Sequence, residues 1–237
     1  MLTLLALAMM QPAAQPVAPS QPPSKPDAPH PTITEVLFAV PRQGDANQDG
    51  ARSATGDEFV ELVNPHDKPI NLKGYSLRDA KRDPKPSDAS PSASINENSF
   101  RFTFPDLTLQ PGEVAVVFNG FESNIPGPVG TREAAAPRNP KFHNAYVFSV
   151  KAQTKYVALA NDGDCITLIS PDAVPLECIY WGAKQQPETA AVTHKAPEAS
   201  GSIQRPAPNA EFVAHQNLPG PDADLAFSPG KFTLKKK

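Results

Sequence analysis

The stretch with the clearest chemistry is the loop at 45–58, which reads D-A-N-Q-D-G-A-R-S-A-T-G-D-E. Oxygen-bearing side chains stand at every second residue, at Asp45, Asn47 and Asp49, and Gly50 follows where an EF-hand-type loop turns sharply. Three short oxygens at this spacing can converge on one hard cation. The pattern therefore predicts a calcium site.

The rest of the expected ligand shell follows the EF-hand pattern less closely. The backbone carbonyl of Ala51 takes the seventh loop position, but Gly56 stands at the twelfth, where an EF-hand has glutamate. Asp57 or Glu58, one or two residues later, would have to complete the shell. The alternative interpretation is a solvated loop in which Asp and Asn side chains bond their own turns without a metal. Bound calcium would make the loop that leads into the next strand more rigid.

The two cysteines lie in neighbouring predicted strands. Cys165 begins the apolar run 165–169 and Cys178 lies within 176–181, and the turn-forming S-P-D-A-V-P between them predicts a hairpin. A four-residue turn would set the cysteines directly opposite each other, and opposed residues share a face with close Cβ atoms. Two outcomes are open, a cross-strand disulfide or a pair of buried thiols that pack like apolar side chains.

Other side chains do not form a recognisable catalytic centre. Histidines stand singly at positions 30, 66, 143, 194 and 215 in polar or proline-containing stretches, which predicts surface residues. Glu58 and Glu61 are three residues apart on a predicted strand, so they point to opposite faces and cannot share acid/base chemistry. We expect Trp181, Tyr180 and Phe118 to pack in the core or at an edge, not to form a sugar-stacking platform.

The composition limits the classes to which this protein can belong. The chain has 237 residues, of which 39% are hydrophobic and 20% charged, so its length allows one or two domains. Its 22 basic and 25 acidic side chains leave a net charge of −3. A general attraction for nucleic acid is therefore not expected. Its 29 prolines argue against long helices.

The N-terminal residues predict an export signal and a tether. Residues 1–14 combine an apolar run, about half the length needed to span a bilayer, with small residues and proline, which resembles a secretory signal peptide. The alternative is a frayed apolar end on a cytosolic protein. The proline-rich residues 15–31 cannot bury enough surface to become ordered, and they predict a disordered, extended linker. We therefore expect a secreted, periplasmic or cell-surface protein without a transmembrane span.

Beyond the linker, short apolar runs alternate with turn signals. No stretch of a dozen residues shows helical periodicity, and some eight short strands predict an all-β sandwich over 32–183 with long polar loops at 79–98 and 120–144. Strand signals thin out in 184–237, which predicts an extended C-terminal tail. The predicted strand segments are 32–40, 58–64, 70–77, 99–104, 113–118, 145–150, 156–159, 165–169 and 176–181.

Seven segments, in chain order, resemble the lamin-tail domain in its bacterial form. The resemblance covers roughly 32–182, and a weaker resemblance continues as far as Gly230. It implies an immunoglobulin-like β-sandwich that is not known as a catalyst and that occurs in exported bacterial proteins, alone or beside hydrolases, nucleases and adhesion modules. The segments are I-T-E-V-L from Ile33, G-D-A-N-Q-D-G from Gly44, D-E-F-V-E-L-V-N from Asp57, L-K-G-Y-S-L-R-D from Leu72, F-T-F-P-D-L-T-L-Q-P-G-E from Phe102, L-A-N-D-G-D-C-I-T-L from Leu159 and the hairpin through Trp181 and Gly182.

Together these features predict a non-catalytic, exported, calcium-stabilised module that binds a protein or cell-envelope partner or serves a structural role. Two alternatives stay open. A small metal-dependent hydrolase, associated with nucleases, would need carboxylates and histidines that converge in one cleft. An adhesin for carbohydrate or the cell envelope would be favoured by an exposed row of aromatic side chains.

Overall fold

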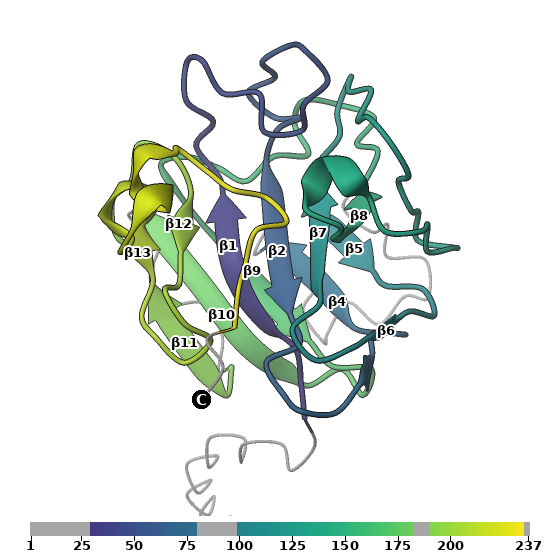
Figure 1. Ribbon diagram of the computed structural model, residues 1–237. Helices are drawn as coiled ribbons and strands as arrows, with labels where there is room; N and C mark the ends of the chain where they lie inside the picture. The colour runs from purple at the N-terminus through teal and green to yellow at the C-terminus, as the bar shows by residue number, and fades with distance from the viewer. Residues whose placement is uncertain (1–28, 80–98, 183–189, 235–237) are drawn as a thin grey trace, which may run out of the picture.

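The chain folds into sheets that face each other, as shown by a computed structural model that describes residues 29–79, 99–182 and 190–234 (Figure 1). The described residues form two larger sheets and one two-stranded sheet, with only short 3-10 helices. The prediction of an all-β, immunoglobulin-like sandwich is therefore confirmed. The predicted signal peptide, most of the linker and most of the 79–98 loop lie outside the described residues. Within the described part, no helix has the length and apolar character needed to cross a membrane.

The first sheet has six strands in the order β13, β12, β1, β2, β7, β8. Its neighbours are antiparallel except β7 and β8, which run parallel. The sequences F-V-E-L-V of β2 and V-A-V-V-F of β7 are buried at every residue, because both faces of this sheet are covered. The strands are β1 (Thr32–Leu37), β2 (Phe59–Val63), β7 (Val114–Phe118), β8 (Tyr146–Ser149), β12 (Ile203–Gln204) and β13 (Val213–Ala214).

The second sheet has the strand order β11, β10, β9, β4, β5, and β3 pairs with β6 in the short sheet. The predicted strand 70–77 divides into two, because Gly74 adopts a φ of 82° and turns the chain. The predicted strand 156–159 is absent, and turns occupy that segment. The strands are β3 (Ile70–Asn71), β4 (Ser76–Asp79), β5 (Arg101–Thr103), β6 (Thr108–Leu109), β9 (Gly163–Ile169), β10 (Pro175–Gly182) and β11 (Val192–Lys195).

An aromatic-rich core lies between the two sheets. Trp181 is 2% exposed, and its ring stacks on Phe38 with centroids 4.3 Å apart. The indole Nε1 donates a hydrogen bond to the carbonyl of Ala160 at 2.7 Å, which satisfies its one polar atom. Phe118 is fully buried in a separate cluster, and Tyr180 is half-buried. The prediction that these side chains pack in the core or at an edge is confirmed.

A second apolar cluster covers the outer face of the first sheet. Phe118 contacts Phe59 and Phe142 with ring centroids 5.4 and 5.3 Å apart, and Phe142 belongs to the helix η1 (Pro140–Phe142). Phe227, from the C-terminal part of the chain, packs against the same cluster. Loops and the C-terminal segment thus form a third layer over this sheet.

The predicted C-terminal tail over 184–237 is wrong. Strand β11 extends the second sheet beside β10, while β12 and β13 extend the first sheet beside β1 (Figure 1). These strands have four, two and two residues, too few for alternation to be read from the sequence. They form because existing sheet edges offer unpaired backbone groups. The helices of this segment are η2 (His215–Asn217) and η3 (Pro221–Asp224).

Candidate functional site

The loop that was predicted to bind calcium is folded by its own side-chain oxygens. Asp45 accepts hydrogen bonds from the N–H of Asp49 at 3.1 Å and of Gly50 at 3.0 Å. The amide oxygen of Asn47 accepts the same Asp49 N–H at 3.0 Å. Asp49 in turn accepts the N–H of Ala51 at 3.0 Å. Oxygens of Asp45 and Asn47 therefore converge on one donor, and the loop consists of tight Asx turns.

Asp57 closes the loop from its far end. Its two carboxylate oxygens accept the N–H of Asn47 at 3.0 Å and of Ser53 at 2.6 Å. Burial raises the pKa of Asp57, the two N–H donors oppose this rise, and the negative charges of Asp45 and Asp49 add to it. Three carboxylates thus share one region of negative potential.

The side chain of Glu58 points into the interior of the protein. It is therefore not placed to bind the cation, as its spacing in the sequence had suggested. Its Oε2 accepts the N–H of Leu159 at 3.0 Å and lies 3.4 Å from Nδ2 of Asn119. Glu61 has other partners, the hydroxyl of Thr34 in β1 and the N–H of Gly230 in the C-terminal segment. Among the described residues, no three or more His, Cys, Asp or Glu side chains form a group that could hold a metal ion.

A second loop, at 120–125, packs against the predicted calcium loop. The hydroxyl of Ser123 accepts a hydrogen bond from Nδ2 of Asn47 at 2.9 Å. The N–H of Asn124 donates to the carboxylate of Asp49 at 3.0 Å. Polar side chains of one loop are thus bonded to the other.

The two loops also touch through their backbones. The N–H of Gly120 donates to the carbonyl of Gly56 at 3.1 Å. A Cβ at Gly56 would collide with the carbonyl oxygen of Phe121 and with a side-chain hydroxyl, so only glycine permits this approach. The loops form one rigid unit at the end of the sandwich where β1 ends and β2 begins (Figure 1).

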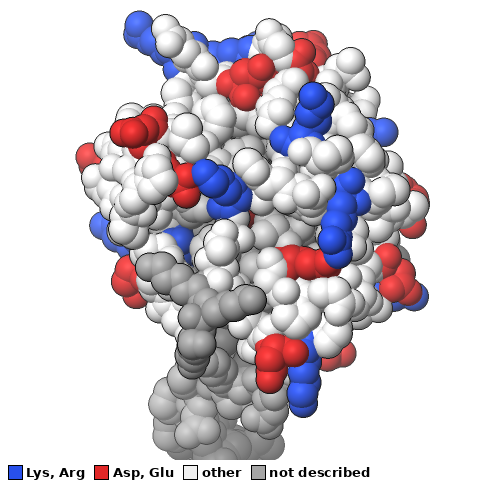
Figure 2. Space-filling model, viewed as in Figure 1, with Lys and Arg blue, Asp and Glu red and all other residues white. Residues whose placement is uncertain are grey.

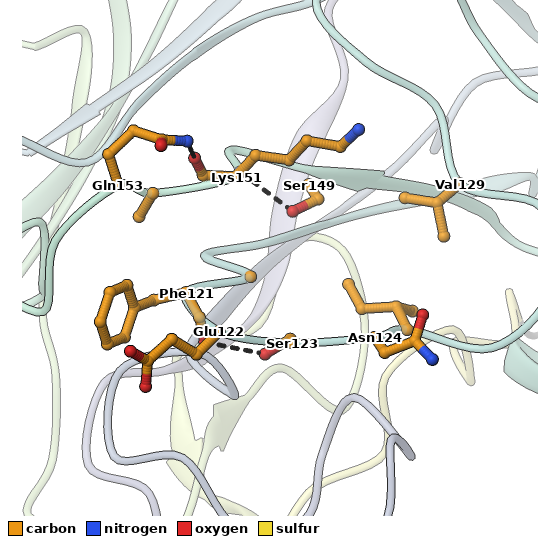
Figure 3. A pocket seen from close by; sticks show the side chains of 11 residues that line it. Phe121, Glu122, Ser123, Asn124, Val129, Ser149, Lys151 and Gln153 are labelled. Atoms are coloured by element: carbon orange, nitrogen blue, oxygen red, sulfur yellow. Dashed lines mark hydrogen bonds between the residues drawn. The ribbon is translucent and has the colours of Figure 1, made fainter.

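A pocket of about 560 Å³ opens between the 120–125 loop and the turn at 149–153. Figure 3 shows these two segments as facing walls. The hydroxyl of Ser149 accepts the N–H of Lys151 at 3.0 Å, which holds the turn in shape. Lys151 and Glu122 are both exposed and give the pocket one cationic and one anionic side chain. The pocket can therefore receive polar groups of either sign.

The hairpin of β9 and β10 places the cysteines differently from the prediction. Tyr180 lies opposite Cys165 and Thr167 lies opposite Cys178, because the turn is one residue longer than assumed and a bulge follows Pro175. The cysteines are diagonal neighbours on one face and are buried thiols. Diagonal side chains lie about 7 Å apart, against roughly 4 Å between Cβ atoms in a disulfide. The predicted register is therefore wrong, and the directly opposed geometry on which the cross-strand disulfide depended does not form.

Two buried glutamates form a site that the sequence pattern did not reveal. Glu35 of β1 and Glu61 of β2 face each other in register, and both are fully buried on the outer face of the first sheet. Glu35 accepts hydrogen bonds from the hydroxyl of Ser202 at 2.5 Å and the N–H of Ser228 at 2.9 Å. The only sequence signal is a single glutamate inside each of the apolar runs I-T-E-V-L and F-V-E-L-V.

The pKa values of this pair are shifted far from the usual range. Burial raises the pKa of Glu35 to about 7 and that of Glu61 to about 8, and the charge of Glu35 adds to the second rise. Glu61 accepts the hydroxyl of Thr34 and the N–H of Gly230, each at 2.7 Å. These donors oppose the rise without cancelling it.

His215 belongs to the same buried cluster. Its Nε2 lies 2.9 Å from the hydroxyl of Ser228 and 3.8 Å from Oε1 of Glu35. Burial lowers its pKa, so the neutral imidazole is favoured. The prediction that all five histidines are surface residues is wrong for His215, because the C-terminal segment that carries it packs on the first sheet.

Comparison with known proteins agrees with this architecture. Residues 26–182, about two thirds of the chain, match the family model of the Lamin Tail Domain. A comparison with curated proteins finds no match. The matched residues carry strands β1 to β10 of the sandwich, and the family consists of immunoglobulin-like domains that are not enzymes. The chain belongs to the lamin tail domain family.

Proposed function

We propose that this protein is a non-catalytic, exported bacterial module that binds a protein or cell-envelope partner through the loop end of its sandwich. The observation that carries the proposal is the pocket of about 560 Å³ between two loops that hydrogen bonds hold in place. A preformed pocket favours binding because little ordering of the loops is required when a partner arrives.

The charges of the protein suit a partner that is recognised by shape and individual polar groups. Figure 2 shows acidic and basic side chains interspersed over the described residues of this face. The net charge of −3 gives no general attraction for nucleic acid. The burial of Trp181 and Phe118 removes these rings as a sugar-stacking platform, so no specific observation favours the adhesin alternative.

A pocket-filling substitution tests the binding role. Gln153→Trp would close the mouth of the pocket, whereas Gln110→Trp places the same ring at another exposed glutamine as a matched control. We expect wild type and Gln110→Trp to sediment with washed envelope of the source organism, and Gln153→Trp to bind roughly tenfold more weakly, about 1.4 kcal/mol. Equal binding by both variants would exclude the pocket. A wild-type protein that fractionates with the cytosol would contradict export.

Calcium stabilisation of the loop is part of the proposal. Oxygens of Asp45 and Asn47 already converge on one N–H, and each keeps a second lone pair for a cation. Burial is the main cause of the raised pKa of Asp57, and the negative charges of Asp45 and Asp49 add to it. A divalent cation would relieve the repulsion among these three carboxylates. The ion would be held by Asp45, Asn47 and Asp49, without Glu58.

Addition of calcium is therefore expected to raise the melting temperature of the wild type. At a calcium concentration tenfold above the dissociation constant, the gain in unfolding free energy is about 1.4 kcal/mol. The double variant Asp45→Asn, Asp49→Asn should lose this gain, while Asp172→Asn in the exposed β9–β10 turn should keep it. Differential scanning calorimetry with calcium, magnesium or chelator measures the effect. If the wild type melts at the same temperature with calcium, magnesium and chelator, calcium does not stabilise the loop.

A further inference from the structure

A second pocket, of about 420 Å³, lies at the opposite end of the sandwich, where β1 begins and β2 ends. Its walls join the region that matches the family model with the C-terminal segment that follows it. His30, His66 and Glu177 come from the first part, and His194 and Arg205 from the second. The segment beyond the family match thus completes this pocket.

Three buried nitrogen atoms in the walls of this pocket have no hydrogen-bond partner among the described residues. They are Nε2 of His30, Nε2 of His194 and Nε of Arg205. Buried nitrogen atoms are almost always paired with protein, water or a ligand. Three such atoms around one cavity indicate that the cavity receives a molecule that carries hydrogen-bond acceptors.

The arginine is held so that one edge of its guanidinium stays available. The side chain of Arg205 is 4% exposed, and its Nη1 donates to the carbonyl of Pro208 at 2.7 Å. Its Nη2 donates to Glu177, and the ring of Phe212 lies 4.4 Å from the guanidinium carbon. These contacts fix the plane of the group, and Nε is the guanidinium nitrogen that has no hydrogen-bond partner among the described residues.

Glu177 balances the charge of Arg205 and accepts hydrogen bonds from three groups. Besides Arg205, it accepts the hydroxyl of Thr32 at 3.0 Å and the N–H of Ile33 at 2.9 Å. His194 lies 3.6 Å from Glu177, beyond hydrogen-bond distance, through its Nε2. The carboxylate therefore does not satisfy His194.

The two histidines are anchored through their other ring nitrogens. Nδ1 of His30 lies 2.6 Å from the hydroxyl of Tyr75, and Nδ1 of His194 lies 3.2 Å from the carboxylate of Glu211. Burial lowers the pKa of His30, and the proximity of His66 lowers it further. Positive charge is thus disfavoured on the His30 ring, and a bound anion would relieve that penalty.

We infer that this pocket binds a small organic anion whose oxyanion group accepts hydrogen bonds from His30, His194 and Arg205. The apolar wall residues Leu176 and Val192 would contact the body of the ligand. A metal ion is disfavoured in this pocket, because no group of three or more His, Cys, Asp or Glu side chains that could hold one occurs among the described residues. The inference does not depend on the role proposed for the loop end.

Nuclear magnetic resonance of the histidine rings tests this directly in the full-length wild type. The chain has five histidines, and three of them line the pocket, so His143 and His215 are internal controls. Sodium phosphate, acetate and butyrate, each compared with chloride at equal ionic strength, should move the ring signals of His30, His194 and His66. The anion that binds should also raise the pKa of His30, because it stabilises the imidazolium.

The three anions distinguish the sources of the oxyanion. Tighter binding of phosphate would show that the natural ligand carries a phosphate group. Tighter binding of butyrate than of acetate would show that it carries a carboxylate on an apolar body. His30→Gln should weaken binding by roughly tenfold, while His143→Gln, at an exposed site, should not. The proposal is overturned if no anion moves the three signals beyond the chloride control, if all five histidines respond equally, or if only zinc moves them.

Discussion

Raising the pH from about 6 to about 9 is expected to lower the free energy of unfolding by on the order of a few kcal/mol, through the buried carboxyls of Glu35 and Glu61. Their pKa values are about 7 and about 8 in the folded protein, against an ordinary value of 4.5. Between these values the folded state binds more protons than the unfolded state. Their contribution is therefore fully present below about pH 4.5 and is lost as the pH rises through 7 and 8.

Most of this pH range lies above 6.5, the ordinary pKa of histidine. The lowered pKa of His215 gives that residue the opposite sign, since its contribution is present above pH 6.5 and is lost as the pH falls through its folded pKa. Denaturant titrations at a series of pH values measure the slope. A free energy of unfolding that stays level between about pH 6 and about pH 9 would contradict the assignment.

A glutamine substitution tests whether the carboxyl pair causes this pH dependence. Glu61→Gln can retain both contacts, because its carbonyl can accept the N–H of Gly230 while its amide donates to the hydroxyl of Thr34. We expect this variant to show a much shallower loss of stability at alkaline pH. Glu198→Gln, at an exposed position, is the matched control and should keep the wild-type slope.

Removal of the C-terminal segment is expected to abolish the stable fold. A chain that ends at residue 199 lacks β12, which pairs with β1, and β13, which pairs with β12. It also lacks Ser202 and Ser228, the donors to the buried carboxyl of Glu35, and Phe227, which covers the outer apolar cluster. The shorter chain would leave a buried carboxyl without its hydrogen-bond donors and would expose an apolar cluster, so it should no longer unfold cooperatively.

The control for this truncation ends at residue 234. It lacks only the three terminal lysines and should unfold at the same denaturant concentration as the full chain. Near-ultraviolet circular dichroism and dye binding to exposed apolar surface distinguish the outcomes. Since the family match ends at residue 182, a shorter chain that unfolds at the wild-type midpoint would show that the later strands are dispensable.

The matched region of the sandwich could be predicted because its signals are local. F-V-E-L-V and V-A-V-V-F identify β2 and β7 from apolar runs between turn residues. The proline-glycine turn at residues 111 and 112, before β7, shows where the chain reverses. Gly74 is an exception, because its turn divides a run that was predicted as one strand. Each of these signals acts over a few residues, so the order of strands in the chain could be read without knowledge of their partners.

Only part of the candidate site could be predicted from local sequence signals. The spacing of Asp45, Asn47 and Asp49 located the turn-rich loop, because side chains that bond their own backbone act locally. Glu58 was assigned to that loop, yet it bonds Leu159, about a hundred residues away. The pocket beside the loop depends on a second segment that carries no motif.

The amino-acid sequence by itself determined the all-β class, the family resemblance and the local shape of the oxygen-rich loop, since alternation and turn chemistry operate between near neighbours. Only the tertiary structure decided the register of Cys165 and Cys178, which one longer turn and one bulge displaced. It also decided the burial of Glu35 against Glu61 and the joining of β11 to β13 onto existing sheet edges. These features arise from contacts between distant segments, where packing and backbone pairing outweigh the weak preferences of two- to four-residue strands.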